Sequence, residues 1–225
     1  MKKFRKVMRV ILLILASLVS AVLIAAGVFA ALGWKMFSEA VEERPVRQVY
    51  ADMQSDEHYV SFDELPDFYV RAVTAVEDHD FWGHSGIDPS AICRALLHDL
   101  AEMEFAEGGS TITMQTAKNL YYTQDKRLER KAAEIFTAFE LEDKLSKEQI
   151  FELYVNTIYF GSNYYGIYAA SVGYYGVPPE ELTDEQCAVL AGIPQAPSVY
   201  SPDENPELAE QRAQQVIAAM EKFGS

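Results

Sequence analysis

Two adjacent carboxylates, Glu77 and Asp78, end an apolar run and precede two aromatic residues, a histidine and two glycines. A carboxylate at a helix end beside the rings of Phe81 and Trp82 loses hydration, which favours its neutral form and raises its pKa. Such a group can remove a proton at neutral pH. Glu77 is therefore a candidate general base. The alternative is a charged helix end that runs into a glycine turn.

A glycine turn at Gly108-Gly109 opens a second polar stretch. Ser110 is the expected N-cap there, and the free N–H groups of a helix start favour an anion. Four polar residues then share one helix face by their spacing. They are Thr111, Gln115, Lys118 and Tyr122. Hydroxyl, amide and ammonium groups suit a phosphate ester, whereas the simpler interpretation is a capped helix with a solvated lysine.

The third stretch is a basic cluster, formed by Lys126, Arg127, Arg130 and Lys131. Together with Lys118 it holds five of the 13 basic residues that follow residue 35. Such a local positive charge suits a pyrophosphate. Glu134 stands four residues after Arg130 and three after Lys131, so helix-surface ion pairs are the alternative.

Chemistry at a glycosidic centre needs paired carboxylates, one to move a proton and one to assist. Glu77 and Glu134 are the two candidates. The basic cluster adds what a plain glycosidase does not require, a place for a diphosphate leaving group. An apolar segment nearer the N-terminus suggests that this diphosphate is attached to lipid.

That apolar segment is Val10–Trp34, 25 positions without a charged residue. As a helix it would reach about 37 Å, more than the roughly 30 Å hydrocarbon core of a bilayer. Five basic residues precede it, so the N-terminus is expected in the cytoplasm and the remainder outside. They are Lys2, Lys3, Arg5, Lys6 and Arg9. A cleaved signal peptide with a weak site at residues 28–30 is the alternative.

Beyond residue 35 the chain carries a net charge of −21, because all 34 acidic residues but only 13 basic ones lie there. This charge excludes nucleic acid as a partner. Cys93 and Cys187 are expected as buried free thiols, with a disulfide formed outside the cell as the alternative. The four histidines show no metal-binding spacing, so no metal site is predicted.

Four segments are expected: a cytoplasmic basic segment (1–9), a transmembrane anchor (10–34), a stalk (35–60) and a domain (61–225). The stalk is interpreted as polar, with a short strand around Val46–Tyr50. Capping signals and apolar spacing predict a mainly α domain. Eight helices are expected. The first runs from Ser61 to Glu77, and the second starts at Asp88-Pro89 and continues through Ile92, Leu96, Leu97 and Leu100. The others begin after Ser110, cover 126–145, begin at Ser146, cover 166–176, run from Thr183 to Gly192, and cover 206–222.

Five motifs in order resemble those of the peptidoglycan glycosyltransferases, found in class A penicillin-binding proteins and in monofunctional membrane-anchored enzymes. They are Glu77-Asp78-x-x-Phe81-x-x-His84-x-Gly86-x-Asp88; Gly109-Ser110-Thr111-Ile112-Thr113-Met114-Gln115-x-x-Lys118-Asn119; Arg130-Lys131-x-x-Glu134; Tyr154-x-Asn156-x-Ile158-Tyr159-Phe160-Gly161 with Tyr165-Gly166-Ile167; and Leu190-Ala191-Gly192-Ile193-Pro194-Gln195-Ala196-Pro197 with Tyr200-Ser201-Pro202. The resemblance covers roughly residues 61–215.

The resemblance implies a lysozyme-like, mainly α fold behind a single N-terminal transmembrane helix. It implies inverting transfer between lipid II molecules, which builds a β-1,4-linked glycan and releases undecaprenyl diphosphate. Glu77 would deprotonate the acceptor 4-hydroxyl, and Glu134 would assist. The substrate-binding residues would be Asp78, His84, Ser110, Thr111, Gln115, Lys118, Lys126, Arg130, Lys131 and Asn156. Lys118, Lys126 and Lys131 would neutralise the diphosphate.

No cofactor is expected to be required, although in some members a divalent ion, Mg or Mn, assists at the diphosphate. The expected partners are lipid II, the growing glycan strand and the bacterial plasma membrane, with cell-wall synthesis proteins as further candidates. Two positions depart from the family pattern. Met114 replaces a usual glutamine, which removes or replaces one polar contact, and Lys126 replaces a common arginine.

The alternatives are a lysozyme-like muramidase or lytic transglycosylase that cuts glycan, and a catalytically silent scaffold. No transpeptidase domain follows the matched motifs, so a monofunctional enzyme is expected, with a fragment of a longer protein as the alternative. An apolar surface near the anchor is expected to dip into the bilayer, with Phe68, Tyr69 and Trp82 as candidates.

Overall fold

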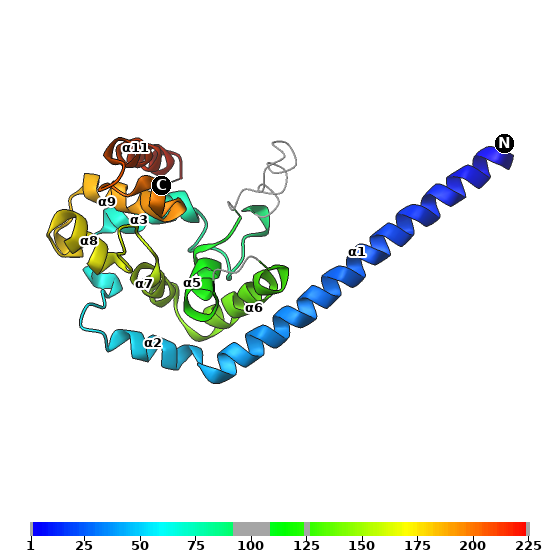
Figure 1. Cartoon of the computed structure of the whole chain (residues 1–225), viewed down its shortest axis with the longest axis horizontal. Helices are drawn as coiled ribbons and strands as arrows, with labels where there is room; N and C mark the ends of the chain where they lie inside the picture. Colours follow the sequence, from blue (N-terminus) through cyan, green and yellow to red (C-terminus); the bar gives the residue numbers. More distant parts are fainter. Residues whose placement is uncertain (1, 92–108, 124–126, 224–225) are drawn as a thin grey trace.

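The computed structural model describes residues 2–91, 109–123 and 127–223 (Figure 1). Several predictions from the sequence lie outside these residues. They concern Gly108, Lys126, Cys93 and the helix through Ile92, Leu96, Leu97 and Leu100.

A single long helix, α1 (Lys2–Glu43), contains the whole apolar segment and continues past Trp34 without a break. Within the described residues it is long and apolar enough to cross a membrane. Figure 1 shows its N-terminal part leaving the domain, whereas its C-terminal part runs beside α6 (Leu128–Lys144). The residues after Trp34 thus extend the anchor helix.

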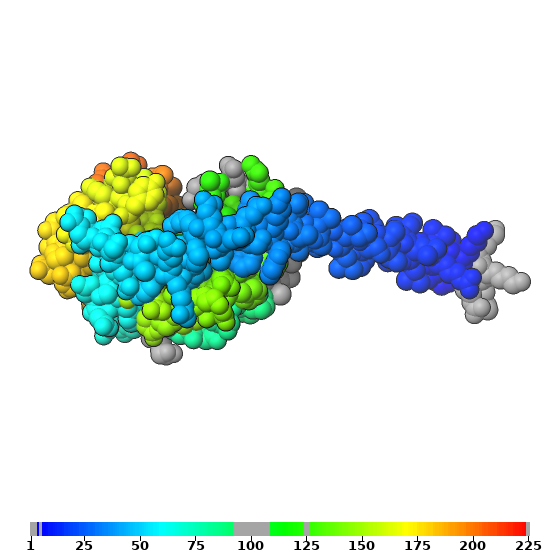
Figure 2. Space-filling view, turned by 90° about the horizontal axis from the view of Figure 1, so that it is seen from below, coloured from blue at the N-terminus to red at the C-terminus, as the bar shows by residue number. Residues whose placement is uncertain are grey.

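The strand expected around Val46–Tyr50 is wrong, because this segment belongs to helix α2 (Val46–Gln54). Val46 and Val49 are its buried residues, and their spacing of three is helical. Pro45 separates α2 from α1, since proline cannot continue a helix that would need its N–H group. Figure 2 shows α1 and α2 lying across one face of the domain.

Close packing joins the anchor helix to the domain. A Cβ atom added at Gly33 would lie 2.5 Å from Ala132 Cβ and 2.9 Å from the backbone of Ala133, so only a glycine allows this approach of α1 to α6. Beside it, the ring of Trp34 meets that of Phe136 edge to face at 5.2 Å between centroids. The end of the apolar segment therefore lies directly on α6.

The domain is mainly α, as predicted. An isolated antiparallel bridge between Tyr159 and Tyr165 is the β pairing found in the part of the chain that the structure describes. Its α-helices are α3 (Asp67–Glu77), α5 (Ile112–Tyr121), α6, α7 (Lys147–Thr157), α8 (Ile167–Tyr175), α9 (Asp184–Gly192), α10 (Pro197–Tyr200) and α11 (Pro206–Phe223). Short 3-10 turns occur at η1 (Phe62–Glu64), η2 (Pro179–Glu181) and η3 (Ile193–Gln195).

Local capping explains where most of these helices begin. Ser146 and Thr183 form the capping boxes of α7 and α9, as predicted. Asp88 accepts from the N–H of Ser90 at 2.7 Å, and residues 89–91 are helical. The helix predicted to begin at Ser61 needs a correction. The capping box of Ser61 caps the start of the short helix η1, and the longer helix α3 begins at Asp67, after Pro66.

Two groups of helices share the core. Helix α5 packs against α6 and α7, whereas α3, α9 and α11 pack against one another. Large buried side chains from both groups fill the space between them, among them Tyr69, Phe81, Phe151 and Tyr154. Cys187 is buried and free, as expected. This arrangement brings the end of α3 against the side of α5.

Candidate active site

Glu77 is the last residue of α3, as predicted, and its carboxylate faces α5. The Gln115 amide donates to Glu77 Oε2 at 2.8 Å. Burial raises the pKa of Glu77 and the charge of Asp78 adds to the rise, whereas the Gln115 hydrogen bond and the positive charge of Arg212 lower it. The burial effect is the largest, so the carboxylate is a stronger base than an exposed glutamate.

The apolar surroundings of Glu77 differ in part from those expected. Phe81 is fully buried, and the ring of Trp82 stacks on that of Phe151 at 6.2 Å. Burial raises the pKa of two phenols, Tyr69 and Tyr154, far above the ordinary tyrosine value, and the charge of Glu77 adds to the rise. Their side chains thus belong to the low-polarity surroundings of the base. Because Tyr69 is fully buried, its expected contact with the bilayer is wrong.

Arg212 was not singled out from the sequence. It lies on α11, 135 residues after Glu77, in an amphipathic helix that showed no other sign of chemistry. Its Nε donates to the carbonyl of Gly192 at 3.4 Å, and its guanidinium carbon lies 5.9 Å from the centroid of the Tyr200 ring. The last helix thereby brings a positive charge into the surroundings of the base.

Asp78 and His84 form a buried pair beside Glu77. The imidazole Nε2 lies 2.8 Å from Asp78 Oδ2, and the same oxygen accepts from the backbone N–H of Ile112 at 3.0 Å. The two side chains are 3% and 6% exposed. Their structural task is to tie the turn after α3 to the start of α5. Their predicted contact with substrate stays a prediction.

The N-cap of α5 is Thr111, which corrects the expectation for Ser110. Thr111 Oγ1 accepts from the N–H of Met114 at 3.1 Å, and its hydroxyl donates to the carbonyl of Gly86 at 2.6 Å. Gly86 has φ of +92°, and a Cβ atom there would lie 3.2 Å from the carbonyl oxygen of Ala138. A glycine is needed at this turn because it must adopt positive φ against α6.

Ser110 instead joins the predicted basic cluster. Lys131 Nζ lies 2.5 Å from Ser110 Oγ and 3.1 Å from Glu134 Oε2. Arg130 pairs with the other oxygen of Glu134. The ion pairs expected as the alternative are therefore present, but they are not exposed on the helix surface, because the Glu134 side chain is only 1% exposed. Glu134 thus pairs with both cations from a buried position.

Lys118 lies on the same helix as Gln115, one turn closer to the anchor. It is partly buried and forms no ion pair with the residues that the structure describes. At the end of this face the hydroxyl of Tyr122 lies 2.6 Å from Thr137 Oγ1 of α6. The structure thus brings Glu77, Gln115, Lys118 and Tyr122 along one side of α5.

Asn156 is engaged by the protein itself. Its amide nitrogen donates to the carbonyl of Val60 at 2.8 Å, and its oxygen accepts from the N–H of Val60 at 3.0 Å. This pair of bonds holds the segment before η1 on α7. Its predicted binding of substrate stays a prediction.

Met114 is 2% exposed and packs in the core. A polar substrate contact from this position is therefore not expected, and the departure from the family pattern affects packing.

The described residues include no group of three or more histidine, cysteine, aspartate or glutamate side chains that could hold a metal ion. A divalent ion at the diphosphate stays a prediction, in which phosphate oxygens would supply most of the ligands.

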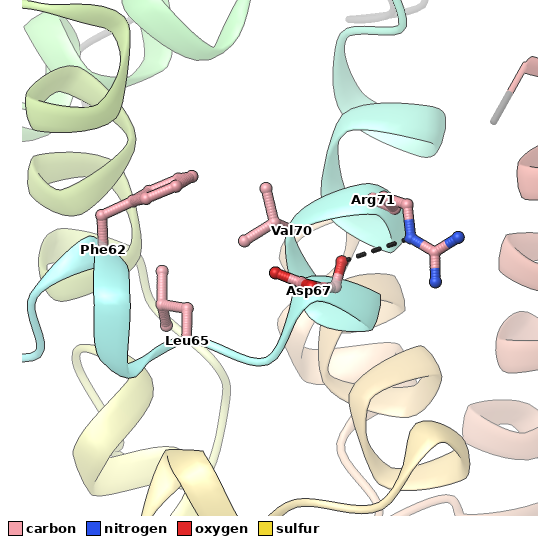
Figure 3. A pocket seen from close by; sticks show the side chains of 5 residues that line it. All are labelled: Phe62, Leu65, Asp67, Val70 and Arg71. Carbon is pink, nitrogen blue, oxygen red and sulfur yellow. Dashed lines mark hydrogen bonds between the residues drawn. The ribbon is translucent and has the colours of Figure 1, made fainter. Parts of the chain in front are cut away.

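A pocket of about 440 Å³ lies away from this site, at the start of α3 (Figure 3). Figure 3 shows Phe62 and Leu65 on one side and Val70 with Asp67 and Arg71 on the other. Asp67 is ten residues before Glu77, about 15 Å along the helix. This pocket therefore does not belong to the chemistry at Glu77.

The fold and the site together define a class of protein: a mainly helical domain that follows an apolar N-terminal helix, with the Glu77 carboxylate against α5 and a buried Glu134 that pairs with two cations. Comparison with known proteins identifies the family within this class. A family model described as Transglycosylase matches residues 42–221. The chain belongs to this transglycosylase family.

Relatives support the assignment. Penicillin-binding protein 1A of Aquifex aeolicus is 44% identical over 166 residues, which are 74% of this chain and 23% of the relative. Penicillin-binding protein 1A/1B of Bacillus subtilis is 45% identical over 74% of this chain and 18% of its own length. A Cupriavidus necator protein named as a candidate transglycosylase is 40% identical over 74% of this chain and 71% of its own length. The chain thus spans about a fifth of the penicillin-binding proteins and most of the shorter relative.

Proposed function

We propose that this protein is an inverting peptidoglycan glycosyltransferase that polymerises lipid II into β-1,4-linked glycan and releases undecaprenyl diphosphate. The observation that carries the proposal is the Glu77 carboxylate, held by Gln115 in surroundings that raise its pKa. Membership of the transglycosylase family supports it independently.

In this proposal Glu77 removes the proton from the 4-hydroxyl of the acceptor sugar. The hydroxyl oxygen then attacks C1 of the donor sugar, the bond from C1 to the diphosphate oxygen breaks, and the configuration at C1 inverts. The raised pKa of Glu77 suits this step, because a base is most effective when its pKa lies near the working pH.

The leaving diphosphate gains negative charge as the bond breaks, and cations beside it stabilise that charge. Lys131 is held between Ser110 and Glu134, and Lys118 lies on the adjoining helix α5. Both ammonium groups suit this task, and Lys126 is a further candidate. Glu134 keeps Lys131 and Arg130 in place, and its predicted assistance at the acceptor would be an additional role.

The proposed orientation has the N-terminus in the cytoplasm and the domain outside the plasma membrane. The basic residues before the apolar segment support it. The contact of Gly33 and Trp34 with α6 supports a domain that lies close to the bilayer surface. There it can reach a lipid-linked substrate.

The test is incubation of the detergent-solubilised protein with labelled lipid II, alongside Glu77→Gln and the matched control Asp80→Asn. Asp80 is an exposed carboxylate three residues further on. We expect lysozyme-sensitive polymer from the wild type and from Asp80→Asn, and none from Glu77→Gln. A folded wild type that makes no polymer, or that digests preformed glycan, would contradict the proposal and favour a muramidase or lytic transglycosylase.

A further inference from the structure

A second cavity lies between the anchor helix and the domain, away from Glu77. Its volume is about 370 Å³, within the usual range for small-ligand pockets. It is bounded by the C-terminal part of α1, the end of α5 and the start of α6. The lining residues are Met36, Glu39, Ala40, Glu43, Tyr121, Tyr122, Thr123, Arg127 and Arg130.

This cavity lies where lipid head groups are expected. The apolar segment of α1 ends at Trp34, and the lining residues of α1 begin two positions later. At 1.5 Å per residue, Met36 lies about 3 Å and Glu43 about 14 Å further along the helix. The head-group layer extends roughly 5–8 Å beyond the hydrocarbon core on each side. Met36 and Glu39 therefore fall in that layer, and Glu43 lies about 6–9 Å beyond it.

The charges of the lining are balanced. Among the lining residues, Glu39 and Glu43 of α1 supply two carboxylates, and two guanidinium groups come from Arg127, the residue before α6, and from Arg130 of α6, which also pairs with the buried Glu134. Two carboxylates repel a diphosphate, which carries several negative charges, so the lining does not favour the leaving group of the proposed reaction. A ligand with one phosphate and one ammonium group meets partners of opposite charge at both ends.

Each end of such a ligand finds suitable chemistry. A guanidinium group can bind two phosphate oxygens at once, which makes arginine well suited to phosphate. An ammonium group pairs with a carboxylate, here Glu39 or Glu43. Met36 and Ala40 leave an apolar side on α1 along which acyl chains could continue toward the bilayer.

The neighbouring contacts preserve the shape of the cavity. Arg44 donates to the carbonyl of Leu120 at 3.0 Å, and the hydroxyl of Tyr121 donates to the carbonyl of Arg44 at 3.0 Å. These bonds join the end of α1 to the end of α5. Charged neighbours of the lining groups include Lys35, an exposed partner of Glu39 at 3.8 Å, and Glu134, the buried partner of Arg130. Arg44 is a third, with its guanidinium carbon 6.0 Å from the centroid of the Tyr121 ring.

We infer that this cavity binds a zwitterionic phospholipid of the phosphatidylethanolamine class, which links the anchor helix to the domain at the membrane surface. Its phosphate contacts Arg127 and Arg130, and its ammonium group contacts Glu39 and Glu43. The inference goes beyond the proposed function and does not depend on glycosyl transfer.

The experiment measures lipids retained by the full chain in native mass spectrometry. The purified protein is offered equal amounts of phosphatidylethanolamine and phosphatidylglycerol with identical acyl chains. We expect the wild type to retain at least about five times more phosphatidylethanolamine, a difference of about 1 kcal/mol. The double variant Glu39→Gln/Glu43→Gln should lose this preference. Glu42→Gln, an exposed change on the same helix outside the lining, should keep it.

Three results would overturn the inference: equal retention of both lipids by the wild type, an unchanged preference in the double variant, or displacement of phosphatidylethanolamine by undecaprenyl diphosphate. The last result would assign the cavity to the lipid substrate. Thermal unfolding in detergent shows that the variants are folded, which is expected because Glu39 and Glu43 are exposed. Polymerisation of lipid II is measured separately, so failure of one proposal does not imply failure of the other.

Discussion

A change of Gln115 to methionine removes the amide that donates to Glu77 Oε2 while keeping a side chain of similar size. The hydrogen bond stabilises the charged form of Glu77, so its loss favours the neutral form and raises the pKa further. A hydrogen bond to a charged group contributes about 1.5–3 kcal/mol. Since one pKa unit corresponds to about 1.36 kcal/mol, the expected rise is about 1–2 units. The lower end of this range applies, because Gln115 is only partly buried and nearby water weakens the hydrogen bond.

The assay is the pH dependence of kcat/KM for lipid II polymerisation, which reports the ionisation of the free enzyme. The base acts only when deprotonated, so the acidic limb of the profile should move to higher pH by about one unit. The rate at high pH should change little. Gln214→Met, an exposed change on α11, is the control and should leave the profile unchanged. An acidic limb that stays in place or moves to lower pH would refute this reasoning, and an equal loss at every pH would show that Gln115 acts by holding substrate.

Three further changes test the site and its supports. Glu77→Gln should raise the melting temperature at pH 7, because the raised pKa of the folded state makes the charged form unfavourable there; the gain should shrink as pH falls through that pKa and vanish below the ordinary value of about 4.3. Gly33→Ala should cost about 1–3 kcal/mol through its clash with α6, whereas Gly27→Ala meets no atom within 4 Å and should not; equal melting temperatures would refute the packing. Asp78→Ala should lower the free energy of unfolding by about 3–5 kcal/mol in chemical denaturation, with the exposed Asp80→Ala as its control; a loss under 1 kcal/mol would contradict the role of the buried pair.

Features that depend on neighbouring residues could be predicted from the sequence. The capping boxes at Ser146 and Thr183, the end of α3 at Glu77 and the shared face of Gln115 and Lys118 all follow from spacing within one helix. The length and composition of the apolar segment likewise predicted a helix able to cross a membrane.

Predictions failed where two local solutions were close in energy. Ser110 and Thr111 are both good N-caps, and the carbonyl of Gly86 and the ammonium group of Lys131, which come from distant parts of the chain, decided between them. The segment that begins at Val46 contains two valines that suit a strand, Val46 and Val49, but burial of one face made it a helix.

The sequence by itself determined the helical class, the anchor and the residue types of the site, because periodicity, charge and capping act over a few residues. Only the tertiary structure decided what surrounds the base. Arg212 and Tyr154 come near Glu77 from α11 and α7, and Lys131 of α6 contacts Ser110 at the start of α5. The tertiary structure also placed the anchor helix against α6, through the close approach at Gly33. Such contacts depend on how whole helices pack, and no short stretch of sequence contains that information.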